Sequence, residues 1–126
     1  MIQAKYKGST EIYILQIIPK LIQISGENRA VLDIVCFGKD GKIFIDRANC
    51  FKVNKCDSLT LATYKHYTED VSIVSVVSLR SEEKKTEPFL FCIFISEDRE
   101  IRIDKTEYFR IKTEAPKEKS RIIKPT

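Results

Sequence analysis

The segment from Thr10 to Ile24 restricts the fold of this chain more than any other. Its apolar residues recur at helical spacing between Ile14 and Ile22. Two properties oppose a helix, because β-branched isoleucines are poor at interior helix positions and Pro19 would remove a helix hydrogen bond and clash one turn back. We therefore predict a long strand that is bent or interrupted at Pro19, which places this residue at a sheet edge or a bulge.

A hairpin is expected directly after this strand. Ala30–Phe37 reads as an apolar-rich strand, and Lys42–Arg47 reads as its return strand with Ile43 and Ile45 on one face. The dipeptide Asp40-Gly41 lies between them and readily adopts the positive φ angles of a tight turn. The pattern predicts two antiparallel neighbours.

The rest of the chain also favours strands. Val71–Leu79, Phe89–Ile95 and Glu100–Lys112 are expected to be strands, and residues 48–70 are expected to hold a short strand and a helical turn. Several of these segments are apolar on both faces, which favours a small five- or six-stranded antiparallel barrel over an open sheet. We predict an all-β protein with little helix and no internal repeat.

One domain is expected, and it spans residues 1–113. Residues 114–126 are rich in Pro, Lys and Glu, a composition that cannot build a core, so we predict a flexible basic tail there. The formal net charge of +4 sits mainly at the two ends of the chain, which leaves the predicted domain nearly neutral. Charge alone is therefore weak support for nucleic-acid binding.

Targeting and membrane signals are not expected. The first residues reach a charge before any apolar run, and the longest apolar stretch, Phe89–Ile95, is far shorter than the ~20 residues of a membrane helix. We expect an intracellular protein, nuclear or cytoplasmic, that does not bind membranes.

Catalysis, metals and cofactors are not expected either. The four cysteines include no Cys-x-x-Cys pair, and His66 is the one histidine of the chain. Cys36 and Cys92 lie in apolar segments and are interpreted as small core residues. The glycines form no phosphate-binding loop, and His66 has no nucleophile or carboxylate motif beside it, so we predict a protein that is not an enzyme.

Aromatic and basic residues alternate in the middle third of the chain. Proteins that bind single-stranded nucleic acid combine a basic groove with aromatic side chains on which bases stack. Alternatively, Phe37, Phe44 and Phe51 fill the core and the lysines are ordinary exposed strand residues. The candidate nucleic-acid residues of this segment are Lys39, Lys42, Phe44, Arg47, Lys52, Tyr64 and Tyr67.

The predicted strand order resembles the OB-fold. A long bent first strand, Glu11–Ile24, precedes a hairpin over Ala30–Arg47, and a last hairpin covers Phe89–Ile111. This order is similar to that of the small OB-fold subunits of replication-protein-A-like and telomere-capping complexes. The resemblance implies a nuclear role and a nucleic-acid surface on strands 2 and 3 and two loops. Those positions are Asn28, Arg29, Lys39, Lys42, Phe44, Arg47, Arg80, Lys84 and Lys85.

The function expected from these observations is that of a non-catalytic OB-like subunit of a protein or nucleoprotein assembly, acting mainly through protein contacts. Apolar residues in surplus on strands and in the tail are the candidate partner-binding residues: Ile12, Ile14, Val74, Val76, Ile122 and Ile123. Single-stranded DNA or RNA binding is an alternative. A PH-like or sandwich adaptor domain is another, although Pro116 and Pro125 oppose the terminal helix of the PH-like version.

Overall fold

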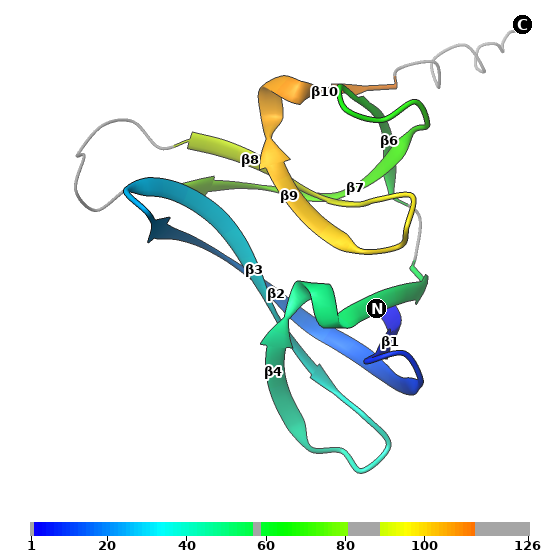
Figure 1. The fold of residues 1–126 in the computed structure, drawn as a ribbon. Coiled ribbons are helices and arrows are strands. Elements are labelled where there is room, and N and C mark those ends of the chain that lie inside the picture. Colours follow the sequence, from blue (N-terminus) through cyan, green and yellow to red (C-terminus); the bar gives the residue numbers. More distant parts are fainter. Residues whose placement is uncertain (1, 57–58, 81–88, 113–126) are drawn as a thin grey trace, which may run out of the picture.

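The computed structural model describes residues 2–56, 59–80 and 89–112 and contains two antiparallel five-stranded sheets, one above the other in Figure 1. The first half of the chain forms sheet A, with β1 (Ile2–Tyr6), β2 (Thr10–Ile24), β3 (Glu27–Phe37), β4 (Ile43–Arg47) and β5 (Phe51–Lys55). The second half forms sheet B, with β6 (Thr60–Tyr64), β7 (Val71–Leu79), β8 (Phe89–Ile95), β9 (Ile101–Lys105) and β10 (Phe109–Ile111). Short 3-10 helices, η1 (Ala48–Cys50) and η2 (Thr106–Tyr108), precede β5 and β10.

The prediction of an all-β protein is confirmed, and the prediction of a barrel is not. The strands divide between two sheets, with the orders β4-β3-β2-β1-β5 and β9-β8-β7-β6-β10, and the sheets are not closed into one barrel. The resemblance to the OB-fold stays a prediction. β1 and the separation of β9 from β10 were not anticipated from the sequence.

The two halves repeat the same unit, so the prediction of no internal repeat was wrong. Their sheet orders are identical when β1–β5 are matched with β6–β10. Tyr6 pairs with Phe51 in the first half, and Tyr64 pairs with Phe109 in the second. Adding 58 to a residue number of the first half gives the equivalent residue of the second half, since 64 − 6 and 109 − 51 are both 58. The same difference relates the register of β3 with β4 to that of β8 with β9.

The repeat is visible in the sequence once the registers are known. The pattern Ala-x-Tyr-Lys-x-x-Thr-Glu occurs at 4–11 and again at 62–69, and Ile-x-Ile-Asp occurs at 43–46 and 101–104. The two patterns meet in space. The Tyr6 hydroxyl donates to Asp46 Oδ2 at 2.5 Å, and the Tyr64 hydroxyl donates to Asp104 in the same way. This hydrogen bond from Tyr6 is the largest influence that holds the pKa of Asp46 below its ordinary value.

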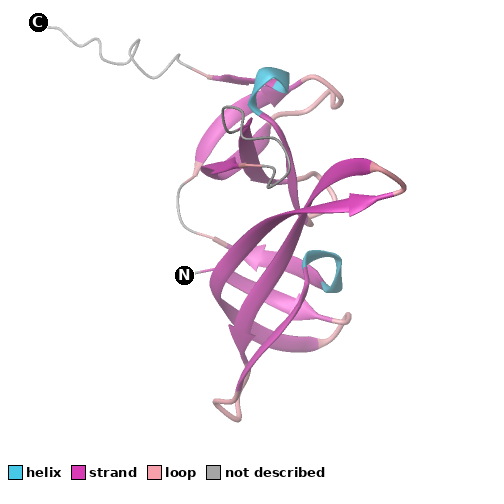
Figure 2. Cartoon of the chain, turned by 90° about the vertical axis from the view of Figure 1, so that its left-hand side faces the viewer, coloured by secondary structure: helices cyan, strands magenta, loops and turns pink. Residues whose placement is uncertain are grey.

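Pro19 shows why a proline is tolerated in the longest strand. The pairing of β1 with β2 ends at Ile14, so among the described strands the later part of β2 pairs only with β3 and has a free edge. Pro19 lies in this two-stranded arm, opposite Leu32, and the register shift falls between Ile14 and Gln16. The predicted edge position is confirmed, while the bulge is not at Pro19. Figure 2 shows the arm of β2 and β3 projecting to one side.

The predicted turn at Asp40-Gly41 is confirmed. Gly41 has a φ of +76°, its amide donates to the Gly38 carbonyl, and β3 and β4 pair on either side. The matching position of the second half is Arg99, which adopts a φ of +71°.

Each half buries the face that carries its Tyr–Asp pair, which we call the inner face; the opposite face is the outer face. Alternating residues of adjacent strands fill these faces, as expected for half-buried strands. The inner core of sheet A includes Ala4, Ile12, Ile14, Ile34, Cys36, Phe51 and Val53. That of sheet B includes Ala62, Tyr64, Val71, Ile73, Cys92 and Phe94.

The turn between β8 and β9 fastens the second half to β5. The Val53 amide donates to the Arg99 carbonyl at 2.9 Å. The Arg99 guanidinium donates to the carbonyls of Val53 and Asn54 at 2.8 and 2.7 Å. An ion pair of 2.9 Å joins Lys52 to Glu100. These contacts occupy the outer edge of β5.

Neither 3-10 helix of the described segments is long or apolar enough to cross a membrane. The predicted tail at 114–126, with Ile122 and Ile123, lies outside the described residues, as do Lys84 and Lys85.

Candidate interaction surface

The outer face of sheet B is covered by the first half. Ile93, Ile95 and Ile101 point away from the inner core of their own sheet, yet they are buried. They belong to one cluster with the buried Leu32 and Ala48 of the first half. Contact between the two halves therefore depends on this apolar face of β8 and β9.

The matching face of sheet A is open. The residues that correspond to Ile93, Ile95, Ile101 and Ile103 are Val35, Phe37, Ile43 and Ile45. Ile43 and Ile45 are 67% and 55% exposed, whereas Ile101 is 3% exposed. The predicted orientation of Ile43 and Ile45 on one face is confirmed, because their side chains both lie away from the core.

Aromatic side chains extend this apolar surface across three strands. Tyr13 of β2 lies beside Phe37 of β3, and their rings stack with centroids 5.5 Å apart. Phe37 lies beside Ile43 of β4, and Val35 lies beside Ile45. We call these five residues, Tyr13, Val35, Phe37, Ile43 and Ile45, the open face. Tyr13, Ile43 and Ile45 are exposed and Val35 and Phe37 are half-buried, and an apolar patch of this kind is typical of an interaction surface.

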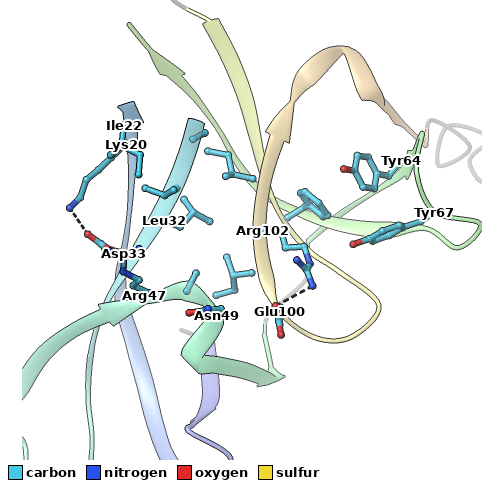
Figure 3. A pocket seen from close by; sticks show the side chains of 16 residues that line it. Lys20, Ile22, Leu32, Asp33, Arg47, Asn49, Tyr64, Tyr67, Glu100 and Arg102 are labelled. Carbon is cyan, nitrogen blue, oxygen red and sulfur yellow. Dashed lines mark ion pairs between the residues drawn. The ribbon is translucent and has the colours of Figure 1, made fainter. Parts of the chain in front are cut away.

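A groove of about 570 Å³ lies between the β2–β3 arm and β9 (Figure 3). Ile22 and Leu32 line it from the arm, and Ile101 and Ile103 line it from β9. Its polar rim carries two ion pairs. Lys20 pairs with Asp33 at 2.5 Å, and Arg102 pairs with Glu100 at 3.1 Å, as the dashed lines of Figure 3 show.

Arg47 connects the groove to the open face. It lies on β4 on the same side as Ile43 and Ile45 and is exposed at the groove wall. Among the described residues, no carboxylate forms an ion pair with its guanidinium. A cation is thus available beside an apolar surface.

The predicted nucleic-acid residues are not gathered in one place. Arg47, Tyr64 and Tyr67 line the groove, although Tyr64 is buried and its ring stacks on Phe109. Lys39 and Lys42 lie exposed around the β3–β4 turn, outside the groove lining.

The remaining candidates of this group have local partners. Phe44 packs edge-on against Tyr6, with ring centroids 5.0 Å apart. Lys52 is held by Glu100, and Arg29 lies 3.9 Å from Glu27 on the β2–β3 arm. Asn28 shares that arm, and Arg80 directly follows β7.

The predicted partner-binding residues separate into core and surface. Ile12 and Ile14 are buried in the inner core of sheet A, so a partner cannot reach them in this structure. The reason is the alternation of β2, which directs them inward and Tyr13 outward. Val74 of sheet B is half-buried against the cluster that contains residues of both halves, and Val76 is exposed. The open face was missed because the two faces of each strand are similarly apolar.

The cysteines match their interpretation as core residues at two positions. Cys36 and Cys92 are buried, and burial raises the pKa of the Cys36 thiol to about 11. Cys50 and Cys56 are free thiols and half-buried. Within residues 2–56, 59–80 and 89–112, no cluster of His, Cys, Asp and Glu side chains could hold a metal ion.

Asp98 stabilises the turn that joins the two halves, and this predicts an acid-sensitive contact. The Ser96 hydroxyl and then Arg102 hold the pKa of Asp98 at about 2, below its ordinary value of 3.8. The lowered pKa means that the carboxylate stabilises the folded state above about pH 4, and that this contribution is lost as the pH falls towards 2. Stability should therefore decrease between pH 4 and pH 2, and Asp98→Asn should reduce the size of that decrease.

Urea unfolding at pH 7, 4 and 2.5 measures this effect. Glu97→Gln, at an exposed carboxylate of the same turn, is the control and should follow the parent at all three pH values. If Asp98→Asn lost as much unfolding free energy as the parent between pH 4 and pH 2.5, the assignment would be contradicted.

Comparison with protein-family models, with curated proteins and with solved structures finds no match to this chain.

Proposed function

We propose that this chain is a non-catalytic protein-interaction module, and that its partner covers the open face of sheet A. One observation carries the proposal: equivalent residues in the two halves have opposite exposure. In sheet B the face with Ile93, Ile95 and Ile101 is used for protein contact, because the first half packs on it. In sheet A the same face, with Ile43 and Ile45, has no cover among the described residues.

The chemistry of the open face suits a protein surface. Interfaces have an apolar and aromatic centre with polar residues at the rim, and Arg is enriched among them. Tyr13 and Phe37 provide stacked rings at the centre of the open face, and Arg47 lies at its margin. The free edge of β4 adds unpaired backbone groups that can take up an extended segment.

Affinity capture with single variants tests this proposal. Ile43→Asp places a charge in the open face, and Leu61→Asp makes the same change at an exposed position of sheet B. We expect proteins bound by the parent chain to be retained by Leu61→Asp and lost, by at least about tenfold in amount, with Ile43→Asp, since a buried unpaired charge is costly. Equal capture by all three chains would contradict the proposal.

Single-stranded nucleic acid binding is the second candidate, and Arg47 is the observation that favours it. The exposed guanidinium and the Tyr67 ring line one groove from opposite ends, so a strand that runs along the groove would meet both a cation and an aromatic ring (Figure 3). Anisotropy of a labelled oligonucleotide at two salt concentrations tests it. Binding should weaken as salt rises and should fall with Arg47→Glu, whereas Lys39→Glu, outside the groove, serves as the control.

A further inference from the structure

The outer edge of β4 is an unpaired sheet edge. β4 pairs only with β3 among the described strands, while the opposite edge of sheet A, at β5, is taken by the turn that carries Arg99. Proteins protect free edges with prolines, bulges or central charges. β4 begins with Ile43, Phe44 and Ile45 and has none of these within that run. Its backbone donors and acceptors are therefore available for another strand.

We propose that a second copy of this chain pairs with β4, antiparallel, about a two-fold axis at Phe44. The inference rests on the proposed function, because it names the partner for the β4 margin of the open face. The resulting interface is isologous, as in most homodimers: each contact between two different residues occurs twice.

Strand geometry leaves few registers for such a pair. Residues that face each other across antiparallel strands direct their backbone groups in the same sense, either towards the partner strand or away from it. Along one strand that sense alternates from residue to residue. When a strand pairs with a copy of itself, even-numbered residues can therefore lie opposite only even-numbered residues, and the two-fold axis must pass through a residue.

The register centred on Phe44 is complementary in charge and in shape. Lys42, the residue directly before β4, lies opposite Asp46 of the second copy, and this ion pair occurs twice. Ile43 lies opposite Ile45 of the second copy, also twice, and Phe44 lies opposite Phe44. Opposite charges, apolar pairs and aromatic pairs at facing positions each stabilise antiparallel strands.

The neighbouring registers lose this complementarity. Centring the pair on Ile43 places Lys42 opposite Phe44 and moves the position opposite Asp46 into the β3–β4 turn, so the opposite-charge pairs are lost. Centring it on Ile45 places Ile43 opposite Arg47 and removes the opposite-charge pairs. Of these three registers, only the one at Phe44 keeps both opposite-charge pairs, which stabilise antiparallel strands at facing positions, so it is favoured.

Pairing at Phe44 also joins the open faces of the two copies. In each copy Phe37 neighbours Ile43, and Val35 neighbours Ile45. Because Ile43 of one copy lies opposite Ile45 of the other, the apolar rows continue from one sheet into the next. The pair forms one ten-stranded sheet, with five strands from each copy.

A head-to-tail contact of the kind that joins the two halves is disfavoured between copies. The join between the halves depends on Arg99 and on the ion pair of Glu100 with Lys52. The positions that match Arg99 and Glu100 in the first half are Gly41 and Lys42, and the position that matches Lys52 in the second half is Arg110. A second copy docked in this manner would lack the Arg99 contacts and would place Lys42 against Arg110.

Sedimentation velocity of the full 126-residue chain over a concentration series is the first test. We expect a reversible dimer. Lys42→Glu places two like-charged pairs in the interface and should weaken the dimer by about tenfold or more. Lys39→Glu makes the same change on the same turn and should leave the dimer unaffected, because position 39 lies in the turn, outside the paired strand. A parent chain that stays monomeric at all concentrations overturns the proposal, as does an equal response to both variants.

Disulfide trapping tests the register of the two β4 strands directly. Ile43→Cys and Ile45→Cys are exposed changes that leave the core intact. We expect a disulfide-linked dimer when the two variants are mixed and oxidised, and little when either is oxidised alone, since facing positions bring Cβ atoms within disulfide reach. Efficient linkage of Ile43→Cys alone, or of Ile45→Cys alone, overturns the register at Phe44. The parent chain, with its four native cysteines, is the background control.

These results separate the dimer from the proposed function. If the chain is monomeric and Ile43→Asp still abolishes capture of other proteins, the proposed function stands and only the dimer is excluded. If the dimer forms and Ile43→Asp captures the same proteins as the parent, the proposed function is excluded. The β4 pairing then stands only if the register tests succeed.

Discussion

Replacing Phe94 by Ala is expected to lower the free energy of unfolding by about 3–5 kcal/mol, through lost burial and the cavity that remains. Phe94 is 1% exposed and belongs to the aromatic cluster of sheet B. Its ring lies 4.8 Å from that of Tyr64 and 5.0 Å from that of Phe109, measured between centroids. Thermal and urea unfolding of the full chain measure the loss.

Phe89→Ala is the matched control because it makes the same change on the same strand. Phe89 is 49% exposed, so its truncation should change stability by no more than about 0.5 kcal/mol. Two variants of equal stability would show that the inner face of sheet B is not as described.

Ile101→Asp is expected to destabilise the chain by about 4 kcal/mol or more. The side chain lies in the cluster that joins the two halves, and aspartate there would be a buried, unpaired charge. Ile43→Asp is the equivalent change in the first half and should alter stability by no more than about 0.5 kcal/mol, because Ile43 is exposed. Urea unfolding of both variants compares two positions that share one place in the repeat.

Similar losses for Ile101→Asp and Ile43→Asp would contradict the difference in exposure on which the proposed function depends. A fully unfolded Ile101→Asp chain would agree with the expected loss. Ile101→Val, which removes one methylene group, then gives a measurable value of about 0.5–1.5 kcal/mol.

Local sequence signals predicted the elements whose causes are local. Asp40-Gly41 forms the expected turn because glycine adopts a positive φ without support from distant residues. Pro19 was assigned to a strand edge, and the edge exists because the pairing of β1 ends before it. The alternation of Ile43 and Ile45 against Phe44 also agrees with the structure.

The cover of β8 was predicted, although its cause was not. Phe89–Ile95 is apolar on both faces, which a barrel would cover, and Phe91 and Phe94 on its two faces are buried. A barrel was invoked to cover them, whereas sheet B's own core covers one face and the first half covers the other. An apolar run shows that a strand is covered but not which element covers it, so the two-sheet arrangement could not be read from Phe89–Ile95 alone.

The candidate site was harder to predict than the strands. Ile12 and Ile14 were chosen as partner-binding residues, while Tyr13 between them is the exposed one. Both faces of β2 are apolar. The alternation of residues along the strand therefore shows which side chains share a face, but not which face is buried. The open face is identified by comparing the two halves in the structure. Ile43 and Ile101 share the Ile-x-Ile-Asp pattern, but Ile43 is exposed and Ile101 is buried.

A photo-crosslinking amino acid placed at position 43, and separately at position 61, tests the open face most directly. Both positions are exposed and apolar, and only position 43 belongs to the open face. We predict a discrete protein adduct from position 43, either with a second copy of the chain or with another protein, and none from position 61. Absence of an adduct at position 43, or the same adducts from both positions, would contradict the assignment of this face as the interaction surface.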